Sequence, residues 1–282
     1  NVDTGVSGRT FRAQGTPSLG RVLAGVLGAV ADPARPGHSL AEAWGDGDLF
    51  ALGSGSDYTA FIDHLGIASL DLAFWPGAAY GVYHSDFDSF EWMDSVGDPG
   101  FVFHVAMAQV WGLVALRLAG TADTNVLPTP IPLNFTLQAE AIFSYIADAK
   151  LHDADQHVDY APLDAAAATF AAAARQAMHD EREAVRTANV ATVAALDERF
   201  AYTERQFLTA GGLPGRKYFK HCLQAPGLYT GYAPKTLPGV YDAVSAGDWK
   251  TANEQAGIAA ARIEAAAKFL QPERTLNTVE SH

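Results

Sequence analysis

The hydrophobic pattern of this chain changes near residue 121. Before that position, short apolar runs are broken by glycines, whereas the later residues form long alanine-rich segments with apolar side chains at helical spacing. We therefore predict two domains, residues 1–121 and residues 122–282, joined by a stiff, proline-containing linker at 124–133. The length of 282 residues agrees, because it exceeds the usual size of one hydrophobic core.

The first domain alternates helical and strand-like patterns. Residues 16–32 repeat apolar side chains every three or four positions after a threonine and a proline, which predicts an amphipathic helix. A glycine-rich turn at 53–56 runs into a second helix that ends near residue 66, and residues 66–74 form a short strand-like run. This alternation predicts an α/β layer.

Segment 101–120 is the most apolar part of the chain and approaches membrane-spanning length. His104, Gln109 and Arg117 would each be costly in lipid, and Asp98 is placed to cap a helix that begins shortly after it. We expect a helix buried against the sheet and no transmembrane segment in this chain.

The second domain is predicted to be all-α. Its alanine-rich segments carry regular apolar residues and interleaved charges, which fits closely packed antiparallel helices in a bundle. Helices are expected at 135–152, 162–188, 190–210, 237–246 and 250–270, with apolar faces marked by Phe170, Met178, Leu196, Phe200, Phe207, Ile258 and Ile263.

The amino-acid composition excludes some kinds of binding partner and covalent link. The formal net charge of -13, from 32 acidic and 19 basic residues, disfavours phosphate backbones, so we expect no nucleic-acid partner. Cys222 is the single cysteine, which excludes an internal disulfide, and we expect it to be a small buried side chain. The first residues show neither an initiator methionine nor a targeting signal, so we expect the chain to be truncated at its start.

Histidines are the first candidates for chemistry. His84 lies in the stretch YGVYHSDFDSFEWM and is followed by three acids. Such a histidine is either a metal ligand or an ordinary polar residue, and the stretch alone does not decide between them. The spacing of His152 and His157 could in principle hold a metal, but we expect both to face solvent.

Five stretches occur in one order along the chain: LGSGSDYTAFIDHLGIAS, VYHSDFDSFEWMDSVGDPGF, AQVWG, LPGRKYFKH and LPGVYDA. Together they resemble the C-terminal part of the zinc metallopeptidase family that includes glutamate carboxypeptidase II and the catalytically silent transferrin receptor. The resemblance implies an α/β then all-α fold, in which residues 1–121 are the C-terminal half of a zinc-exopeptidase α/β domain. Residues 122–282 are then a transferrin-receptor-like helical-bundle dimerisation domain, and a homodimer is expected.

The resemblance also implies roles for single residues. The NVD stretch is similar to the strand end where an aspartate of the family binds one of two zinc ions, which points to Asp3. The YHS stretch is similar to the place where a histidine binds the other zinc, which points to His84, and Tyr83 then donates to the developing oxyanion. Carboxylate, imidazole and phenol are suited to these tasks.

Substrate contacts are implied at Ser54, Gly55, Ser56 and Tyr232. A helix cap at Ser56, with Ser54 and Gly55 as ordinary turn residues, explains the first three positions equally well. Asp71 and Ala73 stand where two arginines of glutamate carboxypeptidase II form a basic patch for acidic peptides. Gly231 stands where that enzyme has a lysine before the tyrosine, and Ser56 replaces its asparagine. We therefore expect no selectivity for glutamate.

The full-length protein is expected to be a peptidase of small peptides with two zinc ions. The other ligands and the catalytic glutamate of the family lie upstream of the NVD stretch, so this chain carries part of a site. Two alternatives stay open, a receptor-like protein without catalysis and an isolated dimerisation module. The parent protein is expected to be extracytoplasmic, either secreted or membrane-anchored.

Overall fold

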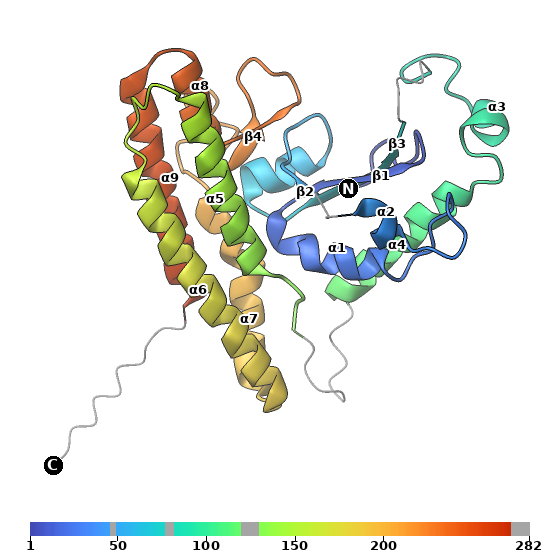
Figure 1. Ribbon diagram of the computed structural model, residues 1–282, viewed down its shortest axis with the longest axis horizontal. Coiled ribbons are helices and arrows are strands. Elements are labelled where there is room, and N and C mark those ends of the chain that lie inside the picture. The colour runs from blue at the N-terminus through green and yellow to red at the C-terminus, as the bar shows by residue number, and fades with distance from the viewer. Residues whose placement is uncertain (46–48, 77–81, 120–129, 272–282) are drawn as a thin grey trace.

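A computed structural model describes residues 1–45, 49–76, 82–119 and 130–271 of the chain. A small sheet with short helices lies beside a bundle of long helices, and the two parts follow one another along the chain (Figure 1). The predicted boundary at residue 121 and most of the predicted linker lie outside the described residues.

The sheet has three strands within the described residues, in the order β2, β1, β3. β1 (Thr10–Gly15) pairs in parallel with β2 (Leu49–Phe50) and antiparallel with β3 (Leu70–Trp75). β3 is the strand predicted at 66–74, whereas β1 and β2 were not predicted. Buried Phe11 and Ala13 alternate with more exposed neighbours along β1, as in a strand with one face on the core.

Short helices surround the sheet. The 3-10 turn η1 (Pro17–Leu19) continues into α1 (Gly20–Leu27), so the helix predicted at 16–32 ends earlier than expected. The π-helix η2 (Ala60–Leu65) follows the glycine-rich turn as predicted. The remaining short elements are α2 (Leu40–Trp44), α3 (Phe90–Trp92) and η3 (Met93–Gly97), and α3 projects from the body of the molecule (Figure 1).

α4 (Val102–Ala119) begins four residues after Asp98, the predicted cap, whose side chain bonds its first turn. The Asp98 carboxylate accepts hydrogen bonds at 3.0 Å from the backbone N–H groups of both Phe103 and His104. The helix packs on α1 and β3 with a buried face that includes Met107, but Val105 on the opposite side is 55% exposed. Length and composition alone would allow α4 to cross a membrane, yet one face belongs to the protein core. The expected burial against the sheet is therefore right for one face only.

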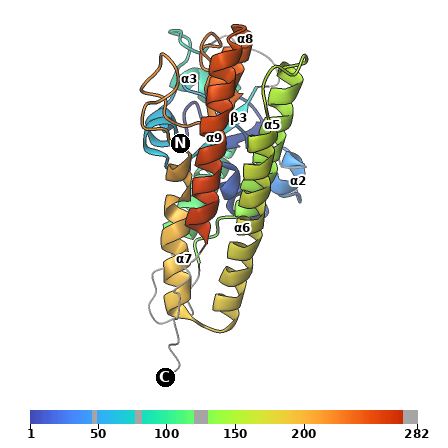
Figure 2. The ribbon, with the colours of Figure 1, turned by 90° about the vertical axis from the view of Figure 1, so that its left-hand side faces the viewer.

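The second part is the predicted helical bundle. α5 (Phe135–His152), α6 (Ala161–Arg186), α7 (Val190–Thr203) and α9 (Trp249–Leu270) lie alongside one another (Figure 2). α7 continues into the 3-10 turn η4 (Glu204–Phe207), and α8 (Pro238–Ser245) is short. The strands β4 (Gln224–Pro226) and β5 (Pro234–Thr236) form an antiparallel pair before α8. All five expected helices are present. Four have ends within two residues of the expected ones, whereas α7 ends at Thr203 and its 3-10 continuation at Phe207, before the expected end at 210.

Most of the predicted apolar faces of the bundle are buried. The buried members of the set are Phe170, Met178, Leu196, Phe200, Phe207 and Ile263. Ile258 is 41% exposed, so its assignment to the core was wrong. Five positions along an α-helix correspond to a rotation of about 140°, so Ile258 and Ile263 cannot both face the core of α9.

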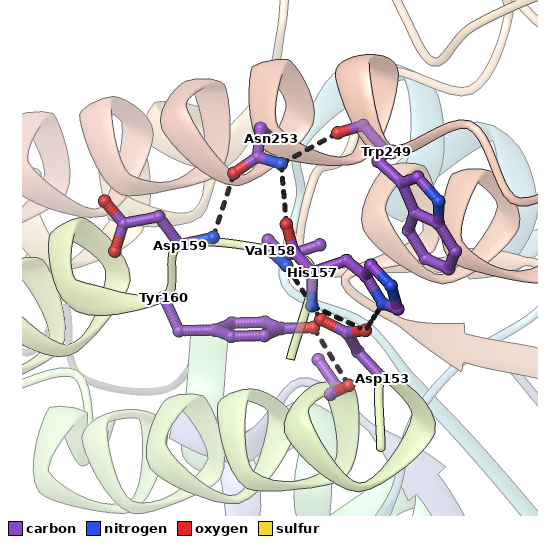
Figure 3. A network of polar contacts seen from close by, with 8 residues as sticks. Asp153, His157, Val158, Asp159, Tyr160, Trp249 and Asn253 are labelled. Carbon is purple, nitrogen blue, oxygen red and sulfur yellow. Dashed lines mark hydrogen bonds and ion pairs between the residues drawn. The ribbon is translucent and has the colours of Figure 1, made fainter. Parts of the chain in front are cut away.

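The loop between α5 and α6 is fastened to α9 (Figure 3). The buried Asp153 carboxylate accepts hydrogen bonds from the backbone N–H groups of His157 at 3.1 Å and Val158 at 2.9 Å. The His157 ring stacks on Trp249 at 4.0 Å, and His152 stacks on Tyr241 at 4.1 Å. Both histidines are exposed, as predicted, but each packs against an aromatic ring.

One continuous cluster of buried apolar side chains extends from Val6 to Leu270 and includes the buried Cys222. At the junction of the two parts, the N–H of Asn134 donates to the carbonyl of Ser18 at 2.8 Å. The parts therefore share a core. A small sheet with flanking helices agrees with the expected α/β layer without identifying a peptidase domain, so that assignment stays a prediction.

Candidate functional site

The glycine-rich turn of the first part and the β4–β5 loop of the second part meet in space. The N–H of Ser54 donates to the carbonyl of Tyr232 at 3.0 Å. Beside it, the N–H of Leu52 donates to the side chain of Gln224 at 3.0 Å, between residues 172 positions apart. Predicted substrate-binding residues from distant parts of the sequence are thus brought together.

Gly55 is required at this junction for two reasons. Its φ of +106° is a conformation that side chains disfavour, and an added Cβ would lie 2.8 Å from the Tyr232 ring. The Tyr232 side chain is 75% exposed, so most of its ring is available to a ligand. Ser54, Gly55 and Tyr232 therefore form one surface, as the proposed common role requires.

Tyr58 supports the glycine-rich turn through a hydrogen bond. Its hydroxyl donates to the carbonyl of Ser54 at 3.0 Å, and its side chain is buried. Burial, with the negative charges of Asp71, Asp63 and Asp3, raises the pKa of Tyr58 to about 12. The phenol therefore stays a neutral hydrogen-bond donor at ordinary pH.

Ser56 connects the turn to the start of the chain. The side-chain amide of Asn1 donates to the Ser56 hydroxyl at 3.1 Å and to the Asp71 carboxylate at 2.7 Å. The following helix η2 has no side-chain cap, so the explanation of Ser56 as a helix cap was wrong. Burial raises the pKa of Asp71, and the bond from Asn1 opposes that rise.

Asp3, a predicted zinc ligand, lies close to this group. Its charge contributes to the raised pKa of Asp71, to which its own backbone is hydrogen-bonded. The Asp3 side chain is exposed and accepts a hydrogen bond from the Thr4 hydroxyl at 3.3 Å, and it forms no ion pair with any described residue. Its carboxylate is therefore open to an external partner.

Tyr83 and His84 form a stacked pair on the loop before α3. Their ring centroids are 3.8 Å apart with an interplanar angle of 20°, and Tyr83 is 53% exposed. His84 has a φ of +59°, which is uncommon for a residue with a side chain and recurs at functional sites. Among the described residues, no contact joins this pair to Asp3 or to the glycine-rich turn, so the structure shows the predicted site in two separate pieces.

Asp63 is a charged residue beside the site that the sequence did not single out. It is fully buried, and neither carboxylate oxygen has a hydrogen-bond partner among the described residues. Burial raises its pKa to about 8, and the opposing positive charge of Arg216 is too weak to reverse this effect. Its backbone carbonyl accepts hydrogen bonds from the N–H groups of Lys220 and His221, so it also fastens the two parts together. An acid within an otherwise apolar helical run was the only signal in the sequence.

The described residues do not form a zinc site by themselves. Asp3 and His84 offer suitable carboxylate and imidazole donors, but the described part of the chain contains no group of three or more histidine, cysteine or acidic side chains placed to hold a metal ion. A closed or catalytic zinc site needs at least three protein ligands. Any zinc bound through Asp3 and His84 therefore requires ligands in addition to those described.

The chain is similar to known peptidases and to a known dimerisation domain. Residues 158–271 match the model of the transferrin receptor-like dimerisation domain. The probable glutamate carboxypeptidase LAMP1 of Arabidopsis thaliana is 36% identical over 249 residues, which cover 86% of this chain and 35% of that protein. A probable glutamate carboxypeptidase of Arthroderma benhamiae is 35% identical over 282 residues, covering 96% of this chain and 38% of its own length.

The aminopeptidase NAALADL1 of Rattus norvegicus is 30% identical over 304 residues, covering 96% of this chain and 40% of that protein. The chain thus spans less than half the length of each of these three relatives.

Proposed function

Because this chain belongs to the family of glutamate carboxypeptidase-like peptidases and the transferrin receptor, we propose that the full-length protein is a zinc-dependent exopeptidase of small peptides. The observation that carries the proposal is the surface formed by Ser54, Gly55 and Tyr232, with Asp3 close by. Relatives are named both as carboxypeptidases and as an aminopeptidase, so the names leave open which end of the peptide is removed.

In this proposal Asp3 and His84 each contribute a ligand to one of two zinc ions, and the remaining ligands come from outside this chain. Zinc in such a site polarises the scissile carbonyl and lowers the pKa of bound water. Tyr83 would donate its phenolic hydrogen to the oxygen that becomes negative in the transition state. The exposure of Tyr83 and the absence of any hydrogen bond to its hydroxyl among the described residues support this role.

Metal analysis tests the proposal. The purified full-length protein should hold about two zinc ions per chain, and His84→Ala should remove about one of them together with most peptidase activity. His179→Ala changes an exposed histidine of α6 and serves as the matched control. A full-length protein that holds less than one zinc per chain and hydrolyses no peptide would favour the receptor-like alternative. Full peptidase activity of His84→Ala would refute the role of that residue.

We further propose that peptides ending in glutamate are not preferred. Asp71, Ala73 and Gly231 supply no positive charge where a glutamate-selective relative uses one, and loss of a desolvated charge pair is worth roughly 2–5 kcal/mol. Values of kcat/KM for a dipeptide panel measure this selectivity. A strong preference for terminal glutamate would show that cations outside this chain supply the missing charge.

The full-length protein is proposed to be a homodimer held largely by the helical part. The matched dimerisation domain supports this assembly. Phe143 and Ile258, which are 43% and 41% exposed, also leave apolar side chains on the surface of the bundle. Light scattering at low micromolar concentration should give the mass of two chains, and a monomer mass would reject the dimer.

An extracytoplasmic location is also proposed, and fractionation of the source cells would test it.

A further inference from the structure

We infer that Arg216 and Asp242 are positioning residues that hold Tyr232 beside the glycine-rich turn. They do so by clamping the β4–β5 loop, residues 227–233, on which Tyr232 lies. The inference rests on the proposed peptidase function, in which Tyr232 contacts the peptide. It adds two residues that lie outside that contact surface and control how tightly the peptide binds.

The β4–β5 loop has few attachments to the rest of the protein. Tyr229 is 92% exposed, and Tyr232 is 75% exposed, so neither ring is held by packing of its own. Among the described residues, two hydrogen bonds join the loop to the body of the protein. One runs from Ser54 to the Tyr232 carbonyl, and the other from the N–H of Leu228 to the Asp242 carboxylate at 3.0 Å. Loss of the second bond would leave the loop attached through the first alone.

Arg216 fixes the Asp242 carboxylate and the end of β4 at the same time. One nitrogen of its guanidinium donates to the carbonyl of Pro226, the residue directly before the loop. Another forms an ion pair at 2.5 Å with the Asp242 oxygen that Leu228 does not use. The two side chains are 12% and 18% exposed, so water and salt screen their attraction only weakly. The start of the loop is thereby tied to α8, the helix that carries Asp242.

The position of Tyr232 depends on this attachment. Pro226 pairs with Pro234 across the two strands, and Tyr232 lies two residues before Pro234. On the other side, an added Cβ at Gly53 would lie 2.0 Å from the Tyr232 carbonyl oxygen, so the loop fits against the turn without spare room. A contact this close needs a loop that is held in place, since a misplacement of roughly 1 Å is enough to impair a binding site.

The test measures kcat and KM of the full-length protein with the best substrate of the dipeptide panel. Arg216→Met should raise KM about 10-fold and leave kcat within about twofold, because Tyr232 contacts the peptide equally before and during the reaction. Asp242→Asn keeps an oxygen for Leu228 but loses the charge, so KM should rise about threefold. In a Tyr232→Ala background, Arg216→Met should raise KM no further, because both changes act through the same ring.

A matched control separates positioning from a general loss of stability. Arg35→Met also breaks an ion pair, here with the buried Asp32 at 2.8 Å, and should leave KM unchanged. A second measurement does not need peptidase activity. Chymotrypsin should cut after the exposed Tyr229 about 10-fold faster in Arg216→Met than in the wild type, whereas Arg35→Met should not alter this rate.

Each result has a distinct meaning. Unchanged KM in Asp242→Asn and in Arg216→Met, with an active wild type, would overturn the inference and leave the peptidase function standing. If Arg216→Met does not fold, the milder Asp242→Asn decides. An undiminished rise of KM in the Tyr232→Ala background would also overturn the inference, because the effect would not pass through Tyr232. Hydrolysis of no dipeptide by the wild type would reject the peptidase function and the inference with it.

Discussion

Replacing Asp63 with asparagine is expected to stabilise the protein more at pH 8 than at pH 5. Asp63 is fully buried, its carboxylate oxygens lack hydrogen-bond partners among the described residues, and burial raises its pKa from 3.8 to about 8. The folded state therefore retains a proton that the unfolded chain releases near pH 4. Stability from this group is fully present below pH 3.8 and is lost as the pH rises toward 8.

The size of the effect follows from the same values. One pKa unit corresponds to about 1.36 kcal/mol, so the wild-type protein should lose on the order of 3 kcal/mol between pH 5 and pH 8 through Asp63. Asparagine does not titrate, so its own packing and hydrogen bonding add only a constant offset. The difference in unfolding free energy between variant and wild type should accordingly grow by about that amount over this range.

Urea unfolding at pH 5, 6, 7 and 8, followed by tryptophan fluorescence, measures this difference. Asp57→Asn removes an exposed carboxylate six positions away and should give a difference that does not change with pH. A constant or shrinking difference for Asp63→Asn would refute the reasoning, because it would mean that Asp63 ionises in the folded protein near its ordinary pKa.

Two further predictions concern backbone geometry and capping. Gly55→Ala should cost about 2–3 kcal/mol of stability and raise KM, because φ at this position is +106° and the new Cβ would meet the Tyr232 ring. Gly231→Ala should cost only about 1 kcal/mol, because φ there is +62° and the space around it is open. Equal losses of stability for the two variants in urea unfolding would contradict this prediction. Asp98→Ala should cost roughly 2–4 kcal/mol, since the buried carboxylate caps α4 and bonds His104, and an unchanged unfolding midpoint would contradict it.

The helices of the second part could be predicted because the residues that stabilise each helix lie close together in the sequence. α5, α6 and α9 carry apolar residues at helical spacing, and Asn134 and Asp248 cap α5 and α9 through their side chains. β1 was missed because TFRAQG alternates only weakly, and the strand depends on pairing with β3, far along the chain. Ile258 was placed in the core because its residue type is apolar, although its helical position points elsewhere.

The candidate site depended on contacts that no local pattern encodes. Ser54, Gly55 and Tyr232 were singled out through resemblance, and only the folded chain shows that a backbone hydrogen bond and a tight glycine contact join them. Asp63 could not be found from the sequence, because its raised pKa comes from burial under residues near 216–221. The pairing of Tyr83 with His84 follows from adjacency, whereas their relation to Asp3 stays a prediction.

The hydrogen bond from Ser54 to the Tyr232 carbonyl also bears on when the protein becomes competent during synthesis. A ribosome delivers the glycine-rich turn long before the β4–β5 loop, and α8 and α9, which follow that loop, must still fold to hold it in place. A nascent chain therefore displays the glycine-rich turn without Tyr232 beside it until the β4–β5 loop has been synthesised and the helices that follow that loop have folded.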